Sequence, residues 1–94
     1  MKVVLNKCFG GFGVSKKAAE YMGVEWDGYG YMFDSQDCRT DERLIKCVEE
    51  LGKEASGALA NIEVVEIPDG SFYIIDEYDG FETIYYSASE VFTK

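Results

Sequence analysis

Apolar side chains first gather at residues 3–5, where three of them stand in a row. Such a run is typical of a short strand that is covered on both faces, and it predicts a strand over residues 2–6. A glycine-rich loop follows this strand. Ser15 is placed to cap a helix over residues 16–22, and Gly23 is placed to end that helix.

The clearest helical pattern comes after an irregular stretch at residues 24–39. Apolar side chains recur at helical spacing at Leu44, Ile45, Val48 and Leu51. Thr40 is the expected N-cap, because two acids follow it in the first turn, where the helix dipole favours negative charge. Gly52 is expected to end the helix, and residues 53–60 are predicted to form a connection or a broken extra turn.

Three runs rich in β-branched and aromatic residues occupy residues 62–67, 72–78 and 81–88. The Asp79-Gly80 pair between the last two runs predicts a tight hairpin. The order β-α-α-β-β-β predicts a single α+β domain over residues 1–94. In this domain a three-stranded antiparallel meander is joined by the N-terminal strand, and the two helices pack on one face. Residues 89–94 are expected at the surface.

Length and composition agree with a compact chain. Of the 94 residues, 47% are hydrophobic and 15% are aromatic, which is too many for an intrinsically disordered protein. No apolar run approaches the roughly 20 residues that span a bilayer, and the N-terminal run is too short for the core of a signal peptide. We therefore expect a cytoplasmic protein with no membrane partner.

The chain contains three cysteines and no histidine. The cysteine spacing fits no zinc pattern, so no metal site is expected. A Ser–His–Asp or Cys–His nucleophile would lack its base. The sequence therefore predicts no catalytic residues and no cofactor, and we expect a protein that is not an enzyme.

Charge is unevenly distributed along the chain. The net charge is −9, yet residues 1–19 carry four lysines and no acid, which leaves −13 for the remainder. This balance argues against direct binding of a nucleic-acid backbone by the bulk of the surface. It suits an acidic protein that selects a basic protein partner.

The glycine-rich loop is the first candidate site. A loop between a strand and a helix N-terminus often binds anions, because free backbone N–H groups and the helix dipole favour negative charge. The candidate residues for a phosphate-bearing small ligand, such as a nucleotide, are Lys7, Gly10, Gly11, Gly13, Ser15, Lys16 and Lys17. The loop matches neither common phosphate-binding motif. The alternative is a tight turn whose glycines permit close packing, with Phe9 and Phe12 as core residues.

The second candidate site is the segment at residues 26–33, which interleaves aromatic residues with glycine. Trp26, Tyr29, Tyr31 and Phe33 offer large, rigid contact areas and are the candidate protein-binding residues. In the alternative interpretation these aromatic side chains cover the core. An exposed aromatic segment and an open strand edge would each support a dimer, so the sequence is compatible with a monomer or a homodimer.

Carboxylates gather on the predicted strands at Glu63, Glu66, Asp76, Glu77, Asp79 and Glu82. Paired carboxylates perform acid–base chemistry or hold a divalent cation. Adjacent strand positions point to opposite faces, however, so we expect a solvated acidic face of the sheet. Cys8, just before the glycine-rich loop, is expected to be buried.

Several motifs are similar to those of a family of small proteins encoded by phages and prophages. They are residues 1–15 (MKVVLNKCFGGFGVS), 64–69 (VVEIPD), 77–82 (EYDGFE), and 49–52 (EELG) with 55–57 (ASG). The resemblance covers most of the chain. Two departures are the lysines at positions 16 and 17, where the family more often has acids, and the lack of a proline near Glu42. The resemblance implies a phage accessory gene expressed in a bacterial cytoplasm and carries over no residue roles.

These features together predict a phage-encoded, non-catalytic binder of a host bacterial protein, in its most specific form an antagonist of an anti-phage defence system. The alternative is a small-ligand binding protein that uses the glycine-rich loop at residues 10–17. A phage structural or regulatory protein is a further alternative, and a metabolic enzyme has the least support.

Overall fold

The computed structural model describes residues 1–88, so the predicted surface segment at residues 89–94 lies outside the described residues. The elements are β1 (Lys2–Asn6), α1 (Lys16–Met22), a 3₁₀ helix η1 (Gln36–Cys38), α2 (Glu42–Leu51), a 3₁₀ helix η2 (Gly52–Ala55), β2 (Ile62–Glu66), β3 (Phe72–Tyr78) and β4 (Phe81–Ser87). This order confirms the predicted α+β class and the predicted succession of strands and helices. Between residues 1 and 88 no helix is long and apolar enough to cross a membrane.

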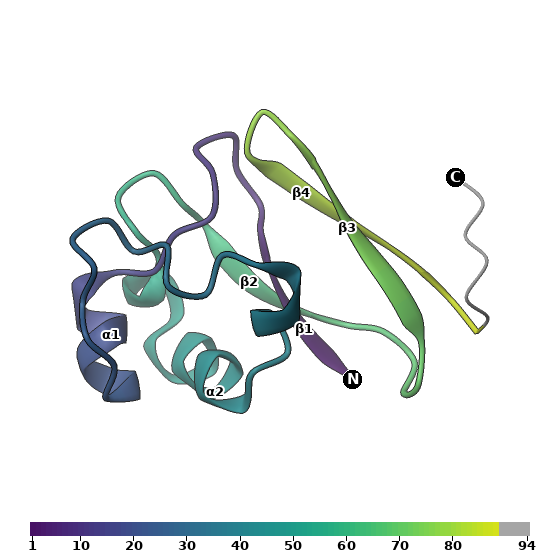
Figure 1. The fold of residues 1–94 in the computed structure, drawn as a ribbon, viewed down its shortest axis with the longest axis horizontal. Helices are drawn as coiled ribbons and strands as arrows, with labels where there is room; N and C mark the ends of the chain where they lie inside the picture. The colour runs from purple at the N-terminus through teal and green to yellow at the C-terminus, as the bar shows by residue number, and fades with distance from the viewer. Residues whose placement is uncertain (89–94) are drawn as a thin grey trace.

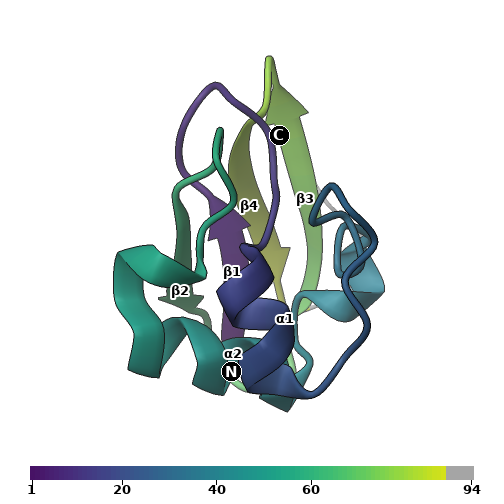
Figure 2. The same cartoon turned by 90° about the vertical axis from the view of Figure 1, so that its left-hand side faces the viewer.

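The four strands form two antiparallel pairs. β1 pairs with β2, from Lys2 opposite Glu66 to Asn6 opposite Ile62. β3 and β4 form the hairpin that the Asp-Gly pair predicts. Figures 1 and 2 show the helices on one side of the β1–β2 pair and the hairpin on its other side.

The alternation of side chains along β1 explains this layering. Val4 is buried in the core that contains both helices, whereas Val3 and Leu5 are buried in a second core. Ile75 and Ile84 of the hairpin pack against that second core. β1 is therefore covered on both faces, as its continuous apolar run predicts.

The predicted three-stranded meander is wrong in one respect, because β2 pairs with β1 and forms no ladder with β3. Both faces of the β1–β2 pair are apolar, so the hairpin has to lie across one face as a covering layer. The Pro68–Ser71 turn carries the chain from one layer to the next. Ile67, just before this turn, is buried between the layers, and its N–H donates to the Met1 carbonyl at 2.9 Å.

The helix caps differ slightly from expectation. Ser15 caps α1 as predicted, since its Oγ accepts a hydrogen bond from the Ala18 N–H at 3.0 Å. α2 is capped by Asp41 instead of Thr40, with the Asp41 carboxylate accepting from the Arg43 N–H at 2.8 Å. An aspartate at this position also places its negative charge at the positive end of the helix dipole. η2 is the broken extra turn expected after Gly52.

Candidate functional site

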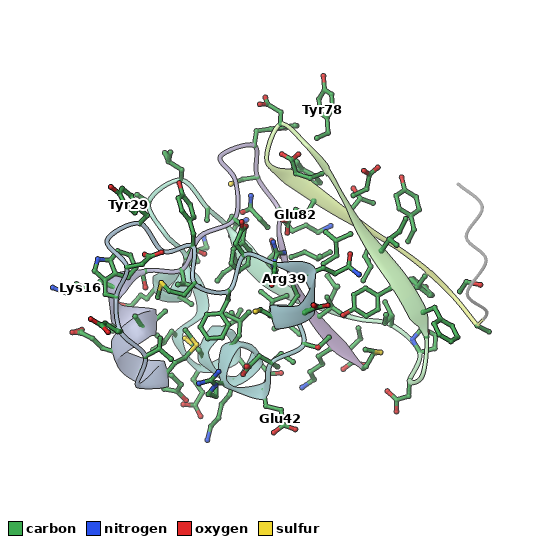
Figure 3. The ribbon with its side chains drawn as sticks, in the orientation of Figure 1. Lys16, Tyr29, Arg39, Glu42, Tyr78 and Glu82 are labelled. Atoms are coloured by element: carbon green, nitrogen blue, oxygen red, sulfur yellow. The ribbon has the colours of Figure 1, made fainter. Side chains whose placement is uncertain are left out.

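A buried ion pair between Arg39 and Glu82 lies near the centre of the molecule in Figure 3. The two groups are bidentate, with Nη1 2.5 Å from Oε1 and Nη2 2.8 Å from Oε2. Their side chains are only 3% and 6% exposed. Glu82 is therefore not part of a solvated acidic face, which corrects the expectation for this residue.

Arg39 uses every N–H of its guanidinium. Besides Glu82 it donates to the carbonyls of Val4, Phe33 and Asp34 at 3.2, 3.2 and 2.8 Å. The guanidinium also lies over the Phe12 ring, 3.8 Å from its centroid. Because all five donors are engaged, the role of Arg39 is to fix these segments to one another.

Asn6, which is fully buried at the end of β1, joins three loops. Its amide donates to the carbonyls of Cys8 and Gly80 at 2.9 and 2.8 Å, and its oxygen accepts from the Asn61 N–H at 2.8 Å. The glycine-rich loop, the hairpin turn and the loop before β2 are thereby held together. Cys8 itself is half-buried.

The glycines of the first loop permit close approach of other backbone segments. A Cβ on Gly10 would lie 1.7 Å from the Leu59 carbonyl oxygen, and the Gly13 carbonyl accepts from the Gly57 N–H at 2.9 Å. The next N–H groups, of Val14 and Ser15, donate to neighbouring carbonyls at 2.9 Å. The packing interpretation of the glycines therefore accounts for Gly10 and Gly13.

The three lysines of the candidate ligand set contact different elements. The Nζ of Lys7 lies 5.4 Å from the centroid of the Phe81 ring on β4. Lys17 forms an exposed ion pair with Glu54 of η2 at 2.8 Å, and Ser15 donates to the carbonyl of the same residue at 2.6 Å. Lys16 is exposed on α1, far to one side in Figure 3.

The aromatic segment is held by one carboxylate. Asp27 accepts hydrogen bonds from the backbone N–H groups of Tyr29, Gly30 and Tyr31 at 2.7, 2.5 and 3.0 Å. These bonds, led by that from Gly30, hold the pKa of Asp27 below its usual range. The Val14 N–H then donates to the Gly30 carbonyl at 2.9 Å, which ties the segment to the end of the glycine-rich loop.

The predicted protein-binding residues divide into two pairs. Phe33 is buried and Trp26 is half-buried against the helical core, as the core-covering interpretation expects. Tyr29 and Tyr31 instead are 75% and 58% exposed, and their rings stack at 6.1 Å with an angle of 9° between their planes. The two exposed tyrosines remain as candidates for contact with a partner.

Two more exposed apolar side chains come from the loops next to this tyrosine pair. We call the group the loop surface: Phe9, Tyr29, Tyr31 and Leu59. A hollow of about 130 Å³ is lined by the glycine-rich loop together with both tyrosines and Leu59. Phe9 lies beside the hairpin, with its ring 5.3 Å from that of Phe81. The loops that carry Phe9 and Leu59 and the hairpin turn meet at the upper end of the molecule (Figures 1 and 2).

The sequence did not indicate two members of the loop surface. Phe9 was expected in the core but is 63% exposed, and Leu59 is 74% exposed. Tyr78 at the end of β3 is also exposed, and here a signal was available, because apolar residues occupy both sets of alternating positions on the last two strands. A two-stranded hairpin buries only one face in this fold, so the other set had to be exposed.

An open cleft of about 470 Å³ lies beside the loop surface. Its floor includes Phe12 and the Arg39–Glu82 pair, and its two sides are the segment at residues 31–36 and the edge of β3. Within residues 1–88 no group of three or more Cys, Asp or Glu side chains is arranged to hold a metal ion. Comparison with known proteins finds no matching family model, no matching curated protein and no matching solved structure.

Proposed function

We propose that this chain is a phage-encoded accessory protein that acts in the bacterial cytoplasm as a non-catalytic, acidic binder of a host protein. The loop surface is its contact area. The observation that carries this proposal is the exposed tyrosine pair, because Tyr29 and Tyr31 stack in the open while Asp27 fixes the backbone that bears them.

Rigid, exposed aromatic residues are what protein interfaces use most effectively. Tyrosine offers a large amphipathic area with few side-chain torsions to restrict, so binding costs little conformational entropy. Here the segment around the pair is already fixed, and Phe9 and Leu59 supply apolar area at its side. The loop surface is therefore largely preformed, and a partner protein could dock on it with little change in this chain's backbone.

Charge selects the kind of partner. The chain carries −9 overall, and exposed carboxylates at Glu77 and Asp79 lie on the hairpin beside the loop surface. A negative rim around an apolar patch accelerates association with a basic protein surface and disfavours acidic partners. A host factor that handles nucleic acid presents such a surface, so antagonism of an anti-phage defence factor is the specific role that we propose.

Native mass spectrometry of the tagged protein, captured gently from bacterial cells that express it, tests the proposal. We expect one host protein to be retained by the parent chain and lost from a Tyr29→Ser/Tyr31→Ser variant. Tyr21→Ser is the matched control, because Tyr21 is a partly exposed tyrosine on α1, outside the loop surface. Equal retention by both variants would refute the role of the loop surface.

A further inference from the structure

On the edge of β3 that faces away from β4, two backbone groups are hydrogen-bonded to the side chain of Gln36. The amide of Gln36 on η1 donates to the Tyr73 carbonyl at 3.2 Å and accepts from the Ile75 N–H at 3.1 Å. A side-chain amide has the same donor and acceptor as a peptide group. At these two residues Gln36 thus occupies the place that a strand would take.

The same edge continues beyond Gln36. Backbone groups of alternate strand residues point to the same side, so the C=O of Ile75 and the N–H of Glu77 face away from β4, as do the groups that Gln36 binds. Ile75 and Glu77 both line the 470 Å³ cleft. The cleft therefore has a strand edge along one side.

The opposite side of the cleft is suited to a cationic side chain. It includes the exposed Tyr31 ring and Asp34, whose side chain is 61% exposed. Glu77 adds an exposed carboxylate from the β3 side, while Arg39 and Glu82 neutralise each other at the floor. A basic residue beside β3 would meet two carboxylates and an aromatic ring.

We infer that the edge of β3 at Ile75–Glu77 is a docking site for an extended, basic segment of the partner protein, which adds to the hairpin as a further strand. Backbone hydrogen bonds to β3 would supply affinity, and the acidic cleft would select lysine or arginine at alternate positions. This inference rests on the proposed function, since it specifies how the partner is held next to the loop surface.

The probe for a test is an acetylated and amidated heptapeptide that alternates lysine with valine. We expect saturable amide shifts at residues 34–36 and 75–77 in ¹H–¹⁵N NMR spectra of the whole chain. The same heptapeptide with its three central residues N-methylated keeps every side chain but loses N–H donors. It should bind about tenfold more weakly, equivalent to one net hydrogen bond.

The protein offers a matched pair of variants. Glu77→Ala and Glu77→Pro both remove the carboxylate, which accepts from the Gly80 N–H at 2.5 Å, but only proline removes the outward N–H. We expect Glu77→Pro to bind the peptide about tenfold more weakly than Glu77→Ala. Near-UV circular dichroism of both variants establishes that the fold is retained before their affinities are compared.

Several results would overturn the inference. They are the absence of saturable shifts at millimolar peptide, equal affinity of the two peptides, and equal affinity of the two variants. A dimer that forms without peptide and dissociates in Glu77→Pro would place a second copy on the edge. A host protein retained equally by Glu77→Pro and Glu77→Ala, but lost from Tyr29→Ser/Tyr31→Ser, would overturn the strand pairing and leave the proposed function standing.

Discussion

Arg39 and Glu82 form a buried ion pair that also closes the open edge of β1. Val4 donates its N–H to the Arg39 carbonyl at 2.9 Å and accepts from the Arg39 guanidinium at 3.2 Å. Asn6 donates its N–H to Glu82 Oε1 at 2.8 Å. One edge of β1 pairs with β2 and the other pairs with these two residues, so no third strand is needed.

We expect Glu82→Gln to lower the free energy of unfolding by about 3–5 kcal/mol, because the Arg39 charge would remain buried without its counter-charge. This loss is a large share of the roughly 5–15 kcal/mol that stabilises a typical domain. Urea unfolding followed by circular dichroism measures it.

Asp34→Asn is the control for this prediction. Asp34 Oδ1 lies 3.7 Å from the same guanidinium, but its side chain is 61% exposed. We therefore expect a loss below about 1 kcal/mol. If Glu82→Gln and Asp34→Asn lowered the free energy of unfolding equally, burial would not be what makes the Glu82 contact strong.

The sequence predicted those elements whose signals are local. The stripe of apolar residues on α2, the Ser15 cap of α1 and the Asp79-Gly80 hairpin turn each lie within one element, and the structure has all three. The apolar run of β1 likewise indicated burial on two faces. Each of these signals reports on a few neighbouring residues and is independent of the remainder of the chain.

The contacts that decide how the layers join could not be predicted in this way. Arg39 and Glu82 are 43 residues apart, and neither belongs to a periodic pattern that points to the other. The pairing of β2 with β1 is also a contact between distant residues. A strand pattern shows that a segment will pair, but it does not identify the strand with which it pairs.

The loop surface illustrates the same limit. Tyr29 and Tyr31 were candidates because their residue type suits an interface, and the sequence did not separate them from the buried Phe33. Phe9 and Leu59 come from loops that meet where Gly10 contacts the Leu59 backbone. Their exposure depends on how the two loops pack through Gly10. Such a contact produces no periodic pattern in the sequence.

Gly30 and Gly28 allow the effect of close packing to be separated from that of backbone conformation. Both have positive φ, 92° and 91°, so alanine is strained by about 1–3 kcal/mol at either position. A Cβ on Gly30 would also lie 2.2 Å from the Val14 carbonyl oxygen, whereas a Cβ on Gly28 meets nothing within 4 Å. We expect Gly30→Ala to be less stable than Gly28→Ala by about 1–3 kcal/mol, measured by urea unfolding. Matching midpoints and slopes for the two variants would contradict this packing argument.

The hydrogen bonds to Asp27 should make the tyrosine-bearing segment sensitive to acid. They lower the pKa of Asp27 in the folded chain, so their stabilisation is complete above the ordinary aspartate pKa of about 3.9. It is lost as the pH falls through the lowered folded value. We expect the amide signals of Tyr29, Gly30 and Tyr31 to titrate together with a midpoint below about 3.9 in ¹H–¹⁵N NMR spectra. A midpoint at or above that value would mean that the carboxylate does not hold the segment in solution.

Charge reversal of the lysines separates the proposed protein binder from the alternative of a phosphate-bearing ligand at the glycine-rich loop. Lys16 and Lys17 project from α1, and the exposed Lys17–Glu54 pair contributes less than about 1 kcal/mol. Lys16→Glu/Lys17→Glu should therefore leave both stability and retention of a host protein unchanged, as measured by urea unfolding and native mass spectrometry.

Lys7 has to be examined separately, because it lies beside Phe81, the ring that Phe9 contacts. Adding Lys7→Glu places a further carboxylate at the margin of the loop surface, which extends the negative rim, so retention of a basic host protein should not weaken. A ligand site in the loop would behave differently. The parent protein would then show a small added mass in its spectrum, and the triple variant would lack this mass because its three reversed charges repel a phosphate. Loss of such a mass in the triple variant, with no host protein retained by the parent chain, would favour the ligand-binding alternative over the function proposed here.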